Sequence, residues 1–325
     1  MTGPAPYSSP VRGRAPPSNG GTSLVEVIGV LCLLALAALA VVVTYSRISA
    51  QDLYNVSGEG LEGGAGRALV FLGYPIALVA LAVLLIVFER LEGALERGAA
   101  LVSAGLSATI VIPGVVDQND LDARPVNALA AIGVGIALVL TAVALARGGL
   151  GEPLPFGAAD AVRLAIAAVL FIAALPWLAA ELGFYIDAVP LLDPVFMSEE
   201  LYREHGEAKA AVHLGDHHGT DGIFLAWTAL ALSRVVPTMG AARAQTVLTA
   251  YLALMLVYGL ALALEDFWLE QLVKRDVTSI RLPNMIRPDL SPAWGAILAV
   301  AAVLAVFAVL HARRSEAHRP PPSGA

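Results

Sequence analysis

Long apolar runs constrain the fold of this chain more than any other feature of its sequence. A helix needs about 20 apolar residues to cross the hydrocarbon core of a bilayer. Backbone groups in lipid have no water to bond, so each run must form a helix that satisfies its own hydrogen bonds. Eight runs meet this length, and they cover residues 24–45, 68–89, 98–116, 127–146, 162–183, 212–235, 244–265 and 291–311. The sequence therefore predicts an all-α fold, a polytopic integral membrane helical bundle of about eight transmembrane helices.

The composition agrees with this fold class and argues against several functions. Of the 325 residues, 58% are hydrophobic and 14% are charged, whereas a soluble domain has about 25% charged residues. The lipid bilayer is therefore the expected partner. A formal net charge of −7 and the absence of a basic stripe in the sequence argue against nucleic-acid binding. The single cysteine, Cys32, rules out an internal disulfide and a cysteine-based metal site.

The placement of arginine and lysine predicts the orientation in the membrane. If the N-terminus is inside, the inner segments hold 11 of the 20 basic residues and six acidic residues, while the outer segments hold nine basic and 20 acidic residues. Both termini are therefore expected in the cytoplasm, and the protein is expected in a plasma membrane. Arginine outnumbers lysine by 18 to 2, and this bias favours a bacterial inner, or cytoplasmic, membrane.

The predicted domain organisation is one membrane domain between two tails. Residues 1–22 and 313–325 are rich in proline, glycine or serine, so disordered cytoplasmic tails are expected there. Residues 23–312 are expected to form the transmembrane helical domain. Its larger outer loops are expected at residues 46–67, 117–126, 184–211 and 266–290. Because most of the extramembrane chain lies on the outer side, the protein is expected to act there.

Ionisable residues gather at the start of the sixth apolar run. The segment from His213 to Gly222 contains half of the six histidines and two aspartates. Ionisable side chains at membrane depth are expensive to bury, and this makes them functional candidates. On one helix over 212–235, five polar residues would share an arc of about 140°, with His218 beside it. These five are His213, Asp216, His217, Thr220 and Asp221.

The opposite side of the same helix is expected to be smooth. Gly215, Gly219 and Gly222 lie on that side. Small residues at such positions let a neighbouring helix approach closely. The pattern therefore predicts a polar face and a packing face on one helix.

Helix rise places other ionisable residues near the depth of this cluster. Counted from Arg234 at the inner interface, Asp221 lies about 20 Å and His217 about 25 Å along the helix. Glu181 lies about 27 Å above Arg163 on the fifth run. The hydrocarbon core is about 30 Å thick, so these side chains fall in its outer third. Their convergence predicts a polar site near the outer face.

This set of side chains suits a borderline divalent metal such as zinc. In an alternative role, Asp216 would not bind the metal itself but would orient an imidazole that binds it. A metal-bound water would support hydrolysis of a lipid-linked or envelope substrate. The candidate metal ligands are His213, His217, His218 and Asp216, and the candidate catalytic residues or completing ligands are Asp221 and Glu181.

The spacing His213-x3-His217-His218 resembles one histidine box of the membrane fatty-acid desaturases and hydroxylases. The resemblance covers that box alone. Two of the remaining histidines, His311 and His318, lie at the inner end of the last run, where they would not complete such a site. The activity of that family is therefore not carried over.

Three alternatives to a metal-assisted enzyme remain open, and the sequence does not decide whether the chain is an enzyme. The helix could begin only near Thr220, which would leave the histidines in a loop with capping residues. The same residues could carry ions or protons in a transporter or permease, although 223–233 then offers only Thr228 and Ser233. A non-catalytic subunit would instead bind a protein partner through the acidic outer loops.

Two local expectations concern helix ends. Thr22 and Glu26 are expected to cap the start of the first helix. An aromatic belt is expected near the outer boundary. Its members would be Trp177, Tyr185, Trp268 and Trp294.

Overall fold

The computed structural model describes residues 22–47, 59–112, 128–182, 201–204, 207–210, 218–273, 276–286 and 288–317. The predicted outer loop 117–126 and most of the predicted loop 184–211 lie outside these ranges. So do nearly all of the predicted N-terminal tail and the last part of the predicted C-terminal tail.

Eight long α-helices make up most of the described chain, and each coincides with one of the predicted apolar runs. The helices are α1 (Val25–Tyr45), α2 (Gly60–Val87), α3 (Ala94–Ala108), α4 (Ala128–Gly148), α5 (Ala158–Leu182), α7 (His218–Leu232), α8 (Ala242–Trp268) and α9 (Pro292–Ala317). Seven of them, all except α7, are long and apolar enough to cross a membrane. The prediction of a helical membrane bundle is confirmed at this level.

Short elements extend or connect these helices. The last helix, α9, continues past the predicted boundary at residue 312. A small antiparallel hairpin precedes α7, with Leu201 opposite Ala210. The short elements are the 3₁₀ turns η2 (Phe88–Arg90), η3 (Thr109–Val111) and η5 (Val236–Thr238), the π-helical turn η6 (Leu269–Val273), and the strands β1 (Leu201–Glu204) and β2 (Glu207–Ala210).

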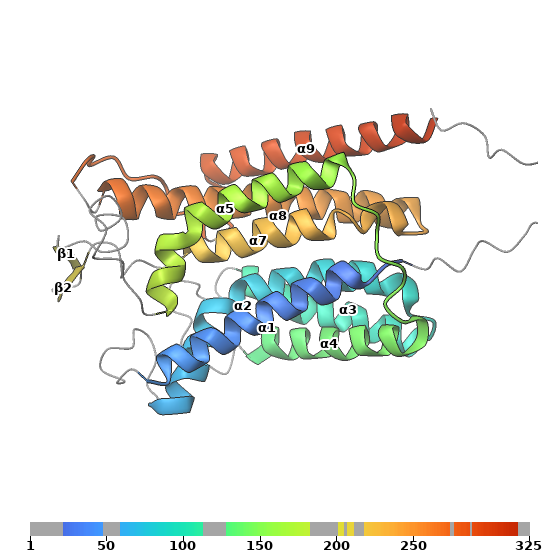
Figure 1. The fold of residues 1–325 in the computed structure, drawn as a ribbon, viewed down its shortest axis with the longest axis horizontal. Helices are drawn as coiled ribbons and strands as arrows, with labels where there is room; N and C mark the ends of the chain where they lie inside the picture. Colours follow the sequence, from blue (N-terminus) through green and yellow to red (C-terminus); the bar gives the residue numbers. More distant parts are fainter. Residues whose placement is uncertain are drawn as a thin grey trace, which may run out of the picture.

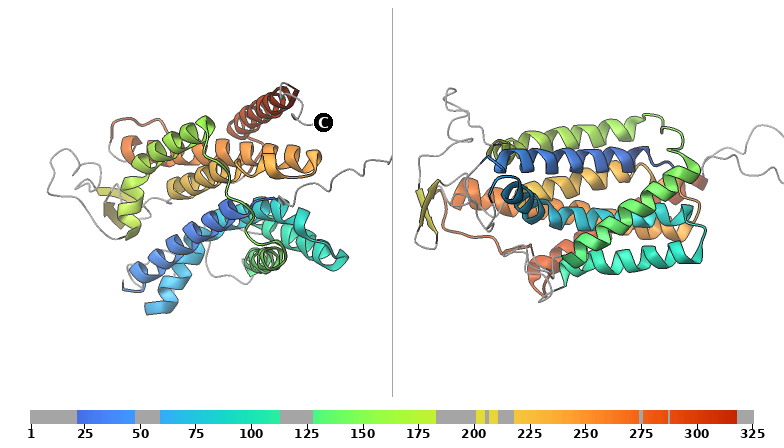
Figure 2. Two further views of the ribbon diagram at one scale, coloured as in Figure 1. Left: turned by 45° about the vertical axis from the view of Figure 1, so that its right-hand side comes forward. Right: turned by 90° about the horizontal axis from the view of Figure 1, so that it is seen from below.

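The helices pack in two groups that meet along α2, α7 and α8 (Figure 1, Figure 2). In the first group, α1, α3 and α4 pack around α2. In the second, α7 packs against α5 and α8, and α9 packs against α8. Figure 1 shows that α1 starts and α9 stops at the same end of the bundle, which we call the tail end. The opposite end, where α1 stops and α7 starts, is called the distal end.

Burial is greatest at the centre of the bundle. Every residue of α7 is buried except Trp227 and Ala231. The peripheral helices instead expose large apolar side chains, among them Leu36, Val169 and Phe307. Extended exposed apolar surface is unfavourable in water but suits contact with lipid. The bundle therefore has α7 enclosed by protein and an apolar outer surface.

Glycines allow α7 and α8 to pack at very short range. A Cβ atom on Gly222 would lie 2.3 Å from the carbonyl oxygen of Gly259, and a Cβ on Gly259 would lie 2.5 Å from the carbonyl oxygen of Gly222. A Cβ on Gly219 would meet the ring of Trp177 at 2.4 Å. The predicted packing face is thus confirmed for Gly219 and Gly222, while Gly215 lies outside the described residues.

Candidate functional site

The first turn of α7 lies inside the protein at the distal end. His218 is 9% exposed, Thr220 is 2% exposed and Asp221 is 5% exposed. Asp221 and Thr220 were predicted to face a polar site at this depth. Because neighbouring helices enclose this turn of α7, His218 is buried as well, although it lies beside the predicted polar arc.

The structure describes the other predicted site residues only in part. Glu181 belongs to α5 by its backbone, and its side chain is outside the described part of the chain. The three residues His213, Asp216 and His217 precede the described start of α7 at His218. Whether the helix reaches back to residue 212 therefore stays a prediction.

An aspartate on α8 holds the start of α7. The backbone N–H of Gly219 donates a hydrogen bond to Oδ2 of Asp266, at 3.1 Å. The Asp266 side chain is 1% exposed. The first N–H groups of a helix have no partner within the helix, and a carboxylate there both accepts a hydrogen bond and complements the helix dipole. Asp266 therefore acts as a capping group supplied by a neighbouring helix.

Among the residues that the structure describes, Asp266 is one of four buried acids at the distal end, which we call the distal acids. Three of them follow one another from the last turn of α8 into the π-helical turn η6, an irregularity that is frequent at functional sites. Sequence reasoning singled out only the one on α7. The available signal for the others was their position, since Glu265 ends the apolar run 244–265 and Asp266 and Glu270 follow it. The distal acids are Asp221, Glu265, Asp266 and Glu270.

Two tyrosines complete the polar part of this region. The hydroxyl groups of Tyr74 on α2 and Tyr258 on α8 lie 2.7 Å apart. Both also lie within hydrogen-bonding distance of the carbonyl oxygen of Ile286, at 3.2 Å and 2.6 Å respectively. Trp294 packs on Tyr258 with ring centroids 4.9 Å apart. Asp221 interacts electrostatically with both tyrosines. The hydrogen bonds to Ile286 therefore anchor the connection between α8 and α9 against α2 and α8.

The described side chains do not by themselves form a metal site. Among the described residues, no group of three His, Cys, Asp or Glu side chains is close enough to hold a metal ion. One observation fits a ligand role, because Nε2 of His218 is buried and has no hydrogen-bond partner within the described part of the chain. The other predicted ligands, His213, Asp216 and His217, are not described. The metal site stays a prediction.

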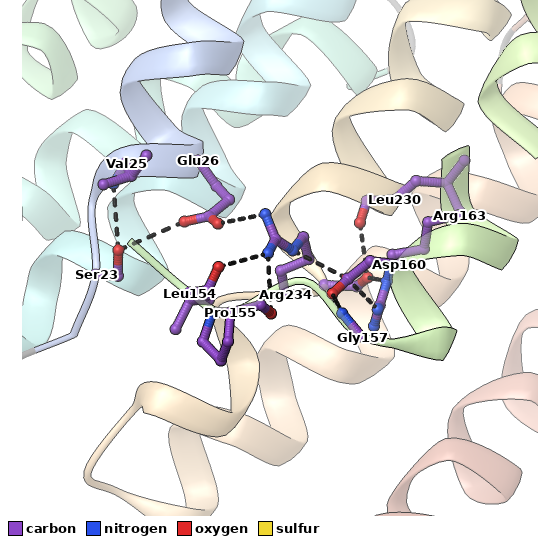
Figure 3. A network of polar contacts seen from close by, with 11 residues as sticks. Ser23, Val25, Glu26, Leu154, Pro155, Gly157, Asp160, Arg163, Leu230 and Arg234 are labelled. Carbon is purple, nitrogen blue, oxygen red and sulfur yellow. Dashed lines mark hydrogen bonds and ion pairs between the residues drawn. The ribbon is translucent and has the colours of Figure 1, made fainter. Parts of the chain in front are cut away.

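A second charged network lies at the tail end, just after α7 (Figure 3). Arg234 contacts Glu26 of α1 at 2.9 Å and Asp160 of α5 at 3.0 Å. Its Nη2 also donates to the carbonyl oxygen of Leu154, at 3.0 Å, in the connection between α4 and α5. One guanidinium group therefore links α1, α5 and α7.

Arg163 extends this network along α5 (Figure 3). Its Nη1 donates to Oδ1 of Asp160 at 2.9 Å, and its Nε donates to Oγ of Ser233 at 2.8 Å. Asp160 thus lies between two arginines. The network balances charge and ties the two helix groups together at the tail end.

The start of α8 is capped by Glu89, which corrects one expectation. Glu89 accepts hydrogen bonds from the backbone N–H groups of Gly240, at 3.0 Å, and Ala241, at 2.9 Å. Thr22 donates to Glu89 at 3.0 Å instead of capping α1. The residue at the N-cap of α1 is Leu24, which forms no side-chain capping bond. Glu26 thus lies in the first turn of α1 as predicted, whereas the cap expected from Thr22 is wrong, because Thr22 bonds to Glu89.

Of the four residues predicted to form an aromatic belt, the structure describes Trp177, Trp268 and Trp294. Trp177 and Trp294 are buried, where they pack against Gly219 and Tyr258. Both rings therefore face protein, and their place near the outer boundary stays a prediction. Tyr185 lies outside the described residues. Trp268 donates from its indole nitrogen to the carbonyl oxygen of Ile280 at 2.7 Å.

No protein family model, no curated protein and no solved structure matches this chain. The function is therefore argued from the residues and their geometry.

Proposed function

We propose that the protein is a multipass protein of a bacterial inner (plasma) membrane, with its tail end in the cytoplasm and its distal end facing outward. The support is the enrichment of arginine at the tail end, since cytoplasmic segments of membrane proteins are rich in Lys and Arg. Most acidic residues lie in the segments assigned to the distal side. The described tail-end arginines are Arg90, Arg97, Arg147, Arg163, Arg234, Arg243, Arg313 and Arg314.

At the distal end, the proposed working part is a cation site at the entrance to α7. The observation that carries this proposal is the burial of the first turn of α7, where His218 and Asp221 lie inside the protein. Ionisable groups cost free energy when they leave water, so such positions are retained mainly for function. His213, Asp216 and His217 directly precede this turn in the sequence.

The proposed cation is a divalent metal such as zinc. Imidazole nitrogens and carboxylate oxygens are ligands that zinc accepts. In this proposal His213, His217, His218 and Asp216 supply the ligands, and the buried Nε2 of His218 is one donor without another partner in the described chain. A divalent ion held there would activate a water molecule for hydrolysis of a lipid-linked or envelope substrate. Asp221 and Glu181 are then the candidates that orient or deprotonate that water.

A transporter is less well supported. Proton or ion passage along α7 would need polar groups that continue from Asp221 toward the tail end. Between Ile223 and Leu232, the described helix has Thr228 as its one polar side chain apart from the indole of Trp227. We therefore place binding and chemistry at the distal end in preference to passage through the bundle.

The test is the metal content of the detergent-purified protein. Wild type is compared with His213→Ala/His217→Ala, and His311→Ala serves as the matched control because it removes a histidine on α9 at the tail end. The proposal expects near-stoichiometric metal in wild type and control, and its loss in the double variant. Absence of metal from all three proteins after loading with zinc would refute it and favour a subunit that binds a protein partner through its acidic outer loops.

A further inference from the structure

A groove at the tail end, remote from the distal site, opens between α5 and α7. Its volume is about 210 Å³, and its lining includes Phe156, Leu164, Trp227 and Leu230. Phe156 and Leu164 are among the large apolar side chains that the bundle exposes. The groove therefore lies on the outer, lipid-facing surface of the bundle.

Trp227 forms a fixed wall of this groove. Its indole nitrogen donates to the carbonyl oxygen of Ala167 at 3.1 Å. Its ring stacks on Phe171, with centroids 6.1 Å apart. From Trp227 to the end of α7 at Leu232 the wall extends about 8 Å at 1.5 Å per residue, and Arg234 lies in the turn that follows. This wall is long and rigid enough to receive the upper part of one acyl chain.

Two arginines form the rim of the groove, and they are its most accessible charged groups. The side chain of Arg163 is 30% exposed and that of Asp160 is 12% exposed. The side chain of Arg234 is 24% exposed and that of Glu26 is 6% exposed. The two guanidinium groups are thus more exposed than the acids that they contact, although Asp160 also lines the groove.

Arg163 has hydrogen-bonding capacity to spare. Its Nε and Nη1 bond to Ser233 and Asp160, and its Nη2 has no partner within the described part of the chain. Guanidinium groups bind phosphate oxygens well because their donors match the geometry of the anion. Basic pockets between transmembrane helices on the cytoplasmic side are recognised by anionic headgroups.

We propose that this groove binds one anionic phospholipid, with its phosphate at Arg163 and Arg234 and an acyl chain along Trp227 and Leu230. The apolar wall directly below the cationic rim favours a lipid over a soluble anion, since a free phosphate would use the rim alone. The site also requires the tail end to meet the cytoplasmic leaflet, where anionic lipids carry the negative surface potential.

The test uses the fluorescence of Trp227 in nanodiscs of phosphatidylcholine. Either phosphatidylglycerol or phosphatidylcholine with brominated acyl chains is titrated in, since bromine quenches an indole that it contacts. The signal of Trp227 is the difference between wild type and Trp227→Phe. We expect brominated phosphatidylglycerol to reach half-quenching at about a fivefold lower mole fraction, as one engaged arginine implies. Equal quenching by the two lipids in wild type would overturn the proposal.

Variants identify the headgroup contact. Arg163→Gln is expected to abolish the preference for phosphatidylglycerol while leaving quenching by brominated phosphatidylcholine unchanged, which shows that the groove is intact. Arg243→Gln is the control, because Arg243 is an exposed tail-end arginine outside the groove lining. It is expected to retain the preference. A preference that persists in Arg163→Gln, or that inorganic phosphate removes, would overturn the proposed lipid site.

Discussion

The two ends of the bundle both bury charged groups, and they do so in opposite ways. At the tail end, the buried Glu26 and the neighbouring Asp160 both contact Arg234. At the distal end, the described buried residues include the four distal acids and one arginine, Arg67. Charge is balanced at the first end and is mainly negative at the second.

This difference distinguishes a charged network that stabilises the fold from a candidate functional site. A buried charge whose partner is removed costs several kcal/mol, so a balanced network is expected to be essential for stability. Acids gathered inside the protein at membrane depth are costly to bury, and such groups concentrate at functional positions. Removing Arg234, the guanidinium that contacts both acids of the tail-end network, should therefore destabilise the protein, while neutralising a distal acid should mainly affect binding.

The largest effect is expected for Arg234→Ala. The substitution leaves the Glu26 carboxylate, which is 8% exposed, without its guanidinium partner. A loss of about 4 kcal/mol in the free energy of unfolding is expected, as for other broken buried ion pairs. Equilibrium unfolding in detergent measures it. Arg243→Ala, at an exposed position, is the control, and equal losses in the two variants would refute the assigned role of the network.

Gly222→Ala is expected to have the next largest effect. The added Cβ would lie 2.3 Å from the carbonyl oxygen of Gly259, so α7 and α8 must move apart. Overpacking against backbone should cost about 3 kcal/mol. Gly295→Ala is the control, because a Cβ there meets nothing within 4 Å. That variant should gain up to about 1 kcal/mol from helix propensity. If both variants unfold like wild type, the close helix contact is not required.

A smaller effect is expected for Asp266→Asn, which keeps the size of the side chain and removes its charge. The N–H of Gly219 retains an acceptor, but the interaction of the carboxylate with the helix dipole is lost. The expected loss is about 1 kcal/mol in the same unfolding measurement. Asp289→Asn, an exposed carboxylate that accepts from the N–H of Ser291 before α9, should change stability less. Equal changes would show that burial adds nothing to the cap.

The smallest effect on stability is expected for Asp221→Asn. The amide has nearly the same shape and keeps a polar group at this position, so the free energy of unfolding should change by less than about 1 kcal/mol. Metal content, measured on the same samples, should fall. A stability loss as large as that of Arg234→Ala would show that Asp221 is an architectural residue like those of the tail end.

The helices were predictable because lipid leaves the backbone few choices. The run 127–146 corresponds to α4 at Ala128–Gly148, and the run 291–311 corresponds to the start of α9 at Pro292. A segment that spans the membrane must be helical, so the length of its apolar run nearly fixes where the helix begins and ends. The packing face of α7 was predictable too, because Gly219 and Gly222 show it in the sequence.

The environment of the candidate site was not predictable in the same way. Tyr74 and Ile286 are separated by 212 positions, yet both contribute to one polar cluster. Helical periodicity assigns residues to faces of one helix, and it does not tell which other helix covers each face. For the same reason periodicity does not identify Asp266 as the cap of α7 or show that Trp177 is buried.

The enclosure of α7 has a consequence for how the chain enters the membrane during synthesis. The described helix is about 22 Å long at 1.5 Å per residue, which is less than the hydrocarbon thickness of about 30 Å. It also begins with His218 and Asp221, which partition poorly into lipid on their own. We therefore expect α7 to leave the translocon together with α8, as a hairpin whose glycine contact forms before either helix meets lipid alone.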